Sequence, residues 1–165
     1  MQKHLYFICP TDGLETVLNS EFKQENYFYT SLGNSLEIDI YSLSQLIELV
    51  LTKEINQITF VLSDDNCIVL ESLKNRCFSE RTGFIGFHQQ ILKQKEDTEV
   101  LWKTRSNEFL ILSYHLNDKI KELKQAFNSF VGTQCLIAGK IYSKNSNTFT
   151  DIYPDIICLE QFNLN

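Results

Sequence analysis

Short apolar runs alternate along the chain with segments whose apolar residues recur at helical spacing. Residues 5–9 are continuously apolar and predict a short buried strand, and Pro10 suits the first turn of a helix that follows. Residues 27–30 form an aromatic and β-branched run that is closed by a turn at Gly33 and Asn34, which predicts a second strand. The chain is therefore expected to begin as strand, helix, strand.

A helical crossover and a third strand come next. From Tyr41 the apolar residues at positions 43, 46, 47, 50 and 51 follow a helical period, and residues 58–62 are then continuously apolar. Strands that are apolar on both faces and separated by helices are typical of an open parallel sheet with helices on both sides. The sequence thus predicts an α/β fold, with one domain over residues 1–165 and a central, mostly parallel sheet flanked by helices.

The second half of the chain is predicted to be mostly helical before it returns to the sheet. Residues 68–73 indicate a short buried helix, and residues 87–130 have helical periodicity. Three lysines lie outside the apolar face of the last helix and predict a solvated surface. They are Lys119, Lys121 and Lys124. Residues 135–142 predict a fourth strand, and the polar residues 143–147 predict a hairpin turn after it.

Composition and charge narrow the function classes. The 165 residues are 43% hydrophobic and 22% charged, as in an ordinary soluble domain. A formal net charge of -6 argues against a nucleic-acid partner. There is no run of about 18 apolar residues to span a membrane, and the first apolar run is too short for a signal peptide. A cytoplasmic protein without a membrane or nucleic-acid partner is the expectation.

The candidate catalytic and metal-binding residues lie where the predicted parallel strands end. Functional groups in such sheets are usually found just past the carboxyl ends of the strands. Cys9 lies at the end of the first predicted strand and at the expected start of a helix, where backbone N–H groups favour a thiolate. Cys67 follows the third strand, and Asp64 precedes it by three residues. Two thiolates and a carboxylate form a plausible zinc set.

The opposing interpretation of each cysteine is a plain core or surface thiol, because cysteine is among the most buried residue types. Cys77, Cys135 and Cys158 are interpreted in this way. The five cysteines are an odd number without an export signal, so most are expected to be reduced. The histidines His4, His88 and His115 have no partner at ligand spacing and are not expected to bind metal.

Several other enzyme classes are disfavoured by missing motifs. Cys9 is not followed six residues on by the arginine of a cysteine phosphatase loop, and the chain has no C-x-x-C. Neither G-x-G-x-x-G nor G-x-x-x-x-G-K-[ST] is present. Nucleotide-cofactor and thioredoxin-type redox enzymes are therefore not expected.

The strand ends resemble those of the β-class carbonic anhydrases. That family carries C-x-D-x-R, then R-N-A-G-N, then G-H-x-x-C-G, each at the end of a strand. This chain has C-P-T-D-G at residues 9–13, T-S-L-G-N at 30–34 and S-D-D-N-C-I at 63–68. A late strand of the form G-x-x-Y-D resembles G-K-I-Y-S at 139–143. The resemblance runs from about residue 5 to residue 151. It rests on the order and spacing of these motifs more than on identical residues.

The departures from the family pattern concern the site itself. In the family two cysteines and a histidine hold zinc; Cys9 and Cys67 match the cysteines, but Asp64 stands in the place of the histidine. The Asp–Arg dyad of the family would fall on Thr11 and Gly13. The carboxylate nearest to it is Asp12, one position late, which makes Asp12 the candidate catalytic residue.

These changes predict weak catalysis. A carboxylate in place of imidazole makes a zinc site more negative, so bound water ionises at higher pH and less zinc hydroxide forms near neutral pH. The favoured hypothesis is a β-carbonic-anhydrase-like scaffold with little or no CO2 hydration, which acts as a binding, regulatory or assembly module with or without zinc.

The alternative hypothesis is a zinc-dependent lyase or hydratase of the carbonate dehydratase type, which uses Cys9, Asp64 and Cys67. The resemblance also implies bicarbonate or another small anion as a ligand, and a homodimer. The chain begins only a few residues before its first strand, so we do not expect the N-terminal arm that pairs subunits in the family.

Overall fold

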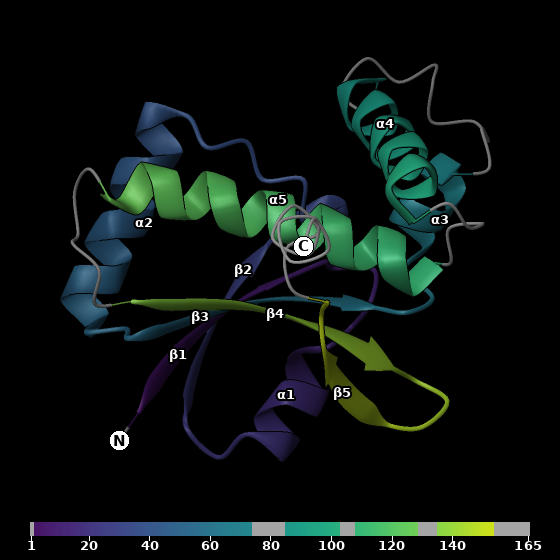
Figure 1. Ribbon diagram of the computed structural model, residues 1–165. Helices are drawn as coiled ribbons and strands as arrows, with labels where there is room; N and C mark the ends of the chain where they lie inside the picture. Colours follow the sequence, from purple (N-terminus) through teal and green to yellow (C-terminus); the bar gives the residue numbers. More distant parts are fainter. Residues whose placement is uncertain (1, 74–84, 103–107, 129–134, 154–165) are drawn as a thin grey trace, which may run out of the picture.

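A five-stranded sheet lies at the centre of the computed structural model, which describes residues 2–73, 85–102, 108–128 and 135–153 (Figure 1). Its strands, in chain order, are β1 (Lys3–Ile8), β2 (Glu25–Thr30), β3 (Gln57–Ser63), β4 (Leu136–Ser143) and β5 (Thr148–Asp151). They are arranged in the order β2-β1-β3-β4-β5, and only β5 runs antiparallel to its neighbour. The predicted α/β class with a mostly parallel sheet is confirmed.

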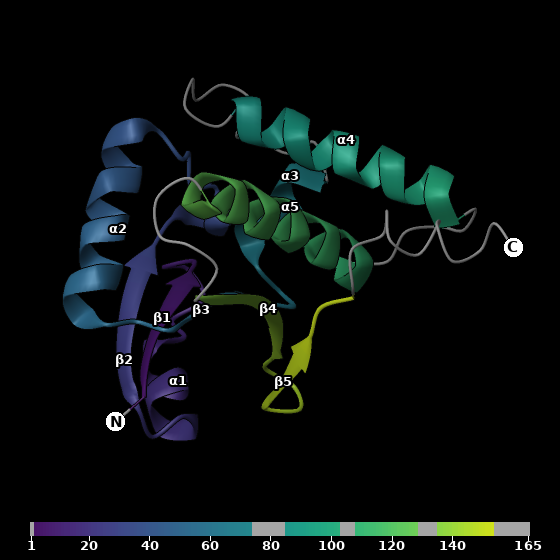
Figure 2. The same ribbon diagram turned by 60° about the vertical axis from the view of Figure 1, so that its left-hand side comes forward.

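Helices cover the two faces of the sheet unequally (Figures 1 and 2). The described helical elements are α1 (Glu15–Glu21), η1 (Leu32–Asn34), α2 (Ile40–Lys53), α3 (Cys67–Leu73), α4 (Ile85–Trp102) and α5 (Glu108–Asn128). Both α2 and α5 lie against one face, α4 lies outside α5, and α1 lies on the opposite face. None of the helices in the described ranges is long and apolar enough to cross a membrane.

The alternation of side chains along the buried strands produces two cores. In β1, Leu5 and Phe7 join the larger core under α2 and α5, whereas Tyr6 and Ile8 join a smaller core under α1. Phe7 stacks on Phe60 of the neighbouring strand with ring centroids 4.6 Å apart. Strands buried on both faces need the nearly continuous apolar sequence seen here, so the apolar runs follow from the layered arrangement.

The first predicted helix begins later than the sequence suggests. Pro10 lies in a turn after β1, in which the Asp12 N–H donates to the Cys9 carbonyl at 3.1 Å, and α1 begins only at Glu15. Gly13 has a φ of +64°, a left-handed conformation that interrupts a right-handed helix. Cys9 therefore lies in a turn and not at a helix N-terminus, which corrects the basis on which a thiolate was predicted.

Other predictions in the second half of the chain meet different outcomes. The polar hairpin is confirmed as a turn over residues 144–147 between β4 and β5. Lys119 was predicted to be solvated, but it is buried, and its ammonium group donates to Glu122 at 2.9 Å. Its long apolar stem allows this placement while the charge stays paired. Cys77, Cys158 and the last two residues of the predicted helical segment 87–130 lie outside the described residues.

Candidate functional site

The predicted site residues leave the sheet at one edge. Cys9 follows β1, Asp64 follows β3, and Cys67 is the first residue of α3. The two strands are parallel neighbours in which Ile8 pairs with Val61, so the loops after them leave the same carboxyl edge. The side-by-side placement that parallel topology predicts for these loops is therefore present.

The Cys9 sulfur is held by partners from the protein itself. The side chain is fully buried, at 0% exposure, and its Sγ accepts the Gly33 N–H at 3.1 Å. The Thr11 hydroxyl lies 3.0 Å from the same sulfur. Thr11 occupies the position that the family resemblance assigns to the aspartate of the dyad. A neutral hydroxyl that binds the sulfur has thus taken that place.

Gly33 connects this sulfur to helix α5. Its N–H donates to Cys9, and its carbonyl accepts from His115 Nε2 at 2.7 Å. Its φ is +60°, and a Cβ atom at this position would lie 2.8 Å from Phe87 Cζ and 3.1 Å from Ile68 Cγ2. Only glycine fits this backbone without strain. We call the three connected residues the Cys9–Gly33–His115 link.

His115 is a neutral histidine in this link. A carbonyl oxygen can only accept a hydrogen bond, so Nε2 carries the proton and Nδ1 is bare. Nδ1 is buried without a hydrogen-bond partner among the described residues. Burial lowers the pKa of His115 to about 4, although the bond to Gly33 raises it in part. Sequence reasoning does not assign His115 this role, because Gly33 is 82 positions away.

Asp12 binds the loop after β3. One carboxylate oxygen accepts the Ser63 N–H at 2.9 Å, and the other accepts the Asn66 side-chain amide at 2.8 Å. Asn66 in turn accepts the Val69 N–H at 3.0 Å, in the first turn of α3. Burial raises the pKa of Asp12, and the bonds from Ser63 and Asn66 offset part of that rise. Both oxygens of the candidate catalytic residue therefore have structural partners.

The outer rim of the edge is acidic. Lys144 forms an ion pair with Asp65 at 3.0 Å and also faces the charges of Asp12 and Asp64. Burial alone would raise the pKa of Asp65, but the bonds from the Ser63 hydroxyl and Lys144 outweigh it and lower that pKa. Three carboxylates surround one ammonium group here. An incoming anion would meet repulsion at this rim.

The described residues do not show the metal-ligand group that the sequence predicts. Among the described residues, no group of three histidine, cysteine or acidic side chains is placed to hold one. Cys9 is buried with its sulfur bonded to the protein, whereas Cys67 is exposed at the start of α3. The zinc set Cys9, Asp64 and Cys67 thus stays a prediction of the sequence. His4 lies at the far end of β1, bonded to Thr59 and Gln24.

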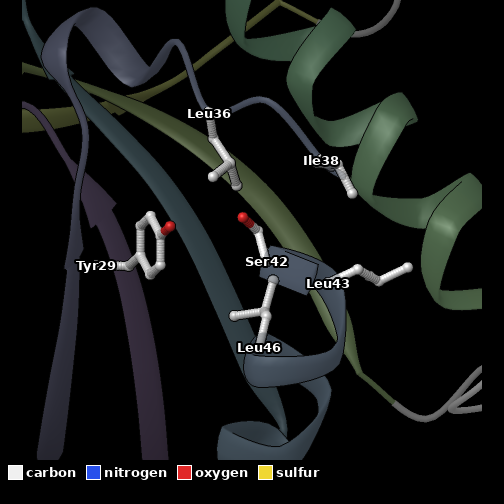
Figure 3. A pocket seen from close by; sticks show the side chains of 6 residues that line it. All are labelled: Tyr29, Leu36, Ile38, Ser42, Leu43 and Leu46. Atoms are coloured by element: carbon white, nitrogen blue, oxygen red, sulfur yellow. The ribbon is translucent and has the colours of Figure 1, made fainter. Parts of the chain in front are cut away.

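Two hollows among the described residues lie away from Cys9. Figure 3 shows one between β2 and α2, where Leu36, Ser42 and Leu46 lie around the ring of Tyr29. Its water-accessible volume is about 0 Å³, so it is a packed crevice and not a ligand site. A hollow of about 300 Å³ lies beside His4, at the opposite end of β1 from Cys9.

Comparison with solved structures identifies the fold. The chain superposes on the β-carbonic anhydrase CafA of Aspergillus fumigatus with a TM-score of 0.71 and 13% identity, covering 97% of this chain and 80% of that one. The β-carbonic anhydrase fold is present. The Coccomyxa β-carbonic anhydrase in complex with acetazolamide gives a TM-score of 0.68 at 12% identity, over 99% and 85% of the two chains.

Further comparisons agree with this fold. A tetrameric β-carbonic anhydrase of Sordaria macrospora gives a TM-score of 0.69 at 10% identity, over 93% of this chain and 81% of that one. No protein-family model matches the chain, and no curated protein matches it either. The β-carbonic anhydrase fold is thus shared at very low sequence identity, and the likeness is one of architecture.

The role of Gly33 can be tested by Gly33→Ala. The left-handed backbone costs an alanine about 1–2 kcal/mol, and the contacts with Phe87 and Ile68 add about 1–3 kcal/mol. The matched control is Gly13→Ala, which has a similar φ of +64° but nothing within 4 Å of its Cβ. Chemical denaturation should show a clearly larger loss in the free energy of unfolding for Gly33→Ala than for Gly13→Ala. Equal losses would show that close packing at Gly33 is unimportant.

The structural role of Asp12 predicts a loss of stability in Asp12→Ala. The Ser63 N–H and the Asn66 amide would lose their buried acceptor, which costs about 1–3 kcal/mol for each group left without a partner. Asp64→Ala, at a half-buried position on the same edge, should change the free energy of unfolding by about 0.5 kcal/mol or less. Denaturant titration of both variants measures the difference, and a negligible effect of Asp12→Ala would contradict the assigned role.

The buried His115 predicts acid sensitivity. Its pKa is about 4 in the folded protein and near 6.5 in the unfolded chain, so the unfolded state binds more protons between these values. The corresponding stability is lost as the pH falls from 6.5 to 4, by about 3 kcal/mol in total.

Denaturant titrations across that pH range should therefore show that the free energy of unfolding depends less steeply on pH in His115→Gln, which keeps a donor for Gly33. His4, with a pKa also lowered to about 4, contributes in the same window and is unchanged in both proteins. The control is His88→Gln, on a half-exposed residue of α4. An unchanged slope in His115→Gln would refute a buried neutral His115.

Proposed function

We propose that this chain is a β-carbonic-anhydrase-like scaffold with little or no CO2 hydration activity, which serves as a binding, regulatory or assembly module. The observation that supports this most directly is the state of the Cys9 sulfur, which is buried and bonded to the Gly33 N–H and to Thr11. A cysteine that acts as a zinc ligand must offer its thiolate to the metal. Here the second candidate thiol, Cys67, is exposed whereas Cys9 is buried, and no group of three candidate ligands forms among the described residues.

The loop after β1 supports the same conclusion. The resemblance assigns the arginine of the dyad to position 13, where Gly13 has a φ of +64°. An arginine with that backbone would be strained, so the loop in this conformation favours glycine at position 13. The carboxylate of Asp12 is bonded to Ser63 and Asn66, which leaves it unsuited to replace the dyad aspartate.

The charge of the edge also opposes the reaction. Hydration of CO2 yields bicarbonate, an anion that a hydratase must hold and release. Lys144 is paired with Asp65 and faces the carboxylates of Asp12 and Asp64, so the rim carries excess negative charge. Bicarbonate or another small anion therefore gains little from this edge.

A direct test is stopped-flow CO2 hydration by the protein as purified and after incubation with Zn²⁺, with metal content measured in parallel. We expect negligible turnover near neutral pH for both, against fast turnover by the Coccomyxa enzyme as the positive control. Fast turnover by zinc-loaded protein would overturn the proposal. It would favour the alternative of a zinc-dependent lyase that uses Cys9, Asp64 and Cys67.

The identity of residue 64 gives a second prediction. Asp64→His replaces a carboxylate with a neutral imidazole and removes one negative charge, so it should strengthen zinc binding on the order of tenfold, or about 1.4 kcal/mol. It should not restore hydration, because Gly13 still provides no cation to orient the product.

The matched control is Asp65→His, at the neighbouring carboxylate that is paired with Lys144. Zinc affinity by competition with a chelating dye, and hydration rates, should be measured on all three proteins. Equal zinc affinity of Asp64→His and Asp65→His would contradict a special position for residue 64. Full activity of Asp64→His would contradict the importance of Gly13.

A further inference from the structure

The hollow beside His4 lies on the face of the sheet that carries α1, near the amino ends of the strands. Its floor is formed by residues of β1, β3 and β4, and its sides by Phe22 and Gln24, which follow α1, and by Asp151 of β5. Among the described helices, only α1 lies on this face (Figures 1 and 2). The volume of about 300 Å³ is at the lower end of the range for ligand pockets, so the hollow suits a small molecule.

Hydrogen bonds fix the direction of two donors in the floor of this hollow. The Gln24 side-chain nitrogen donates to His4 Nδ1 at 2.9 Å and to the Tyr6 hydroxyl oxygen at 3.1 Å. Because Nδ1 accepts, the neutral ring carries its proton on Nε2, which donates to the Thr59 hydroxyl oxygen at 2.8 Å. Burial lowers the pKa of His4 to about 4, so the ring is neutral near pH 7. Both hydroxyl oxygens therefore accept within the protein, and their own protons are left to donate.

The hydroxyl protons of Tyr6 and Thr59 have no acceptor among the residues that the structure describes. Tyr6 is 2% exposed and Thr59 is 4% exposed, and both line the hollow, so an acceptor has to come from inside it. Burial raises the pKa of Tyr6 to about 12, so the phenol keeps its proton. A buried donor without an acceptor is unfavourable. A ligand that brings an acceptor oxygen would therefore be stabilised here.

Lys140 adds a positive charge to the same hollow. Its charge is felt at His4, where it helps burial to lower the pKa. Asp151 pairs with Lys140, but the side chain of Asp151 is 80% exposed whereas that of Lys140 is 29% exposed. An ion pair with an exposed partner is weak, so a ligand carboxylate can replace Asp151. Two hydroxyl donors and an ammonium group suit an anionic acceptor with two oxygen atoms.

Apolar side chains line the rest of the hollow. Leu136 is 60% exposed at the start of β4, and Ala138 follows it on the same face of the strand. Phe22 lines the hollow from the side of α1, with its ring centroid 6.1 Å from that of Tyr6. Covering Leu136 would remove apolar surface from water. A ligand therefore gains from an apolar body beside its carboxylate.

We propose that this hollow binds a small monocarboxylate with a compact apolar body, about the size of one aromatic ring. The carboxylate accepts from the Tyr6 and Thr59 hydroxyls and pairs with Lys140, and the body packs against Phe22 and Leu136. The proposal goes beyond the function proposed above. It does not rest on the loss of hydration, because the hollow lies at the opposite end of β1 from the carboxyl edge.

An NMR titration of the full chain with benzoate tests the proposal. A ligand of about nine non-hydrogen atoms should bind with a Kd of about 0.1–1 mM. Benzyl alcohol, which has the ring without the charge, and bicarbonate, which has the charge without the ring, should each bind about 10-fold more weakly or less. The backbone amides of His4, Thr59 and Ala138 should shift. Shifts confined to the carboxyl edge, or equal affinity for bicarbonate, would overturn the proposal.

Two variants remove the donors. Tyr6→Phe keeps the ring but removes a hydroxyl, so it should weaken benzoate binding by about 10-fold. Lys140→Gln, at a partly exposed position, should weaken it by about 5-fold. The matched control is Lys3→Gln, because Lys3 is 27% exposed and pairs with the exposed Glu54 outside the hollow. Lys3→Gln should leave benzoate binding unchanged, and equal losses in the two lysine variants would overturn the proposal.

Asp151→Asn provides a test in which binding should improve. Its carboxylate competes with the ligand for Lys140, so the variant should bind benzoate about 2- to 5-fold more tightly. Because Asp151 is exposed, the substitution carries little risk of misfolding and does not depend on the buried Tyr6. Weaker binding of benzoate by Asp151→Asn would overturn the proposal. So would unchanged affinity in a folded Tyr6→Phe protein.

Discussion

Gly33 is the residue on which the arrangement at the carboxyl edge depends. Its N–H binds the sulfur at the end of β1, and its carbonyl binds His115 in α5, so one residue connects the sheet to the helix above it. The connection requires a left-handed backbone and a residue without a Cβ atom, because Phe87 and Ile68 lie too close to leave room for one. The turn after β2, the position of α5 and the state of Cys9 are therefore coupled. Displacing any of them would leave a buried polar group without its partner.

A second set of hydrogen bonds completes the edge without a metal ion. In a zinc centre the metal would join the loops after two strands through its ligands. Here the loops are joined by Asp12, which accepts from Ser63 and Asn66, while Asn66 also holds the start of α3. The cost of these bonds is a buried carboxylate, whose pKa is raised by burial. The loops are therefore organised by hydrogen bonds between the protein's own groups.

Sequence reasoning predicted the fold well, because a parallel sheet leaves a clear pattern. The apolar runs at 5–9, 27–30 and 58–62 correspond to β1, β2 and β3, and their parallel order places Cys9 and Asp64 at one edge. The contacts of the site were not predictable in the same way. The bond between His115 and Gly33 joins positions 82 residues apart, and nothing in local spacing indicates it. The start of α1 was misplaced because the left-handed Gly13 overrides the preference of Pro10 for a helix start.

The periodicity of apolar residues in α2 did not predict which of them are buried. The positions 43, 46, 47, 50 and 51 were all assigned to one apolar face, yet Leu51 is exposed while Leu43, Leu46 and Val50 are buried. The sheet covers only part of the apolar circumference of α2, and Ile40 lies wholly outside that part. An apolar stripe that the fold does not bury reduces solubility unless another surface covers it. A scaffold whose strand ends are closed by its own hydrogen bonds can still present such a surface, since the two features lie on different elements.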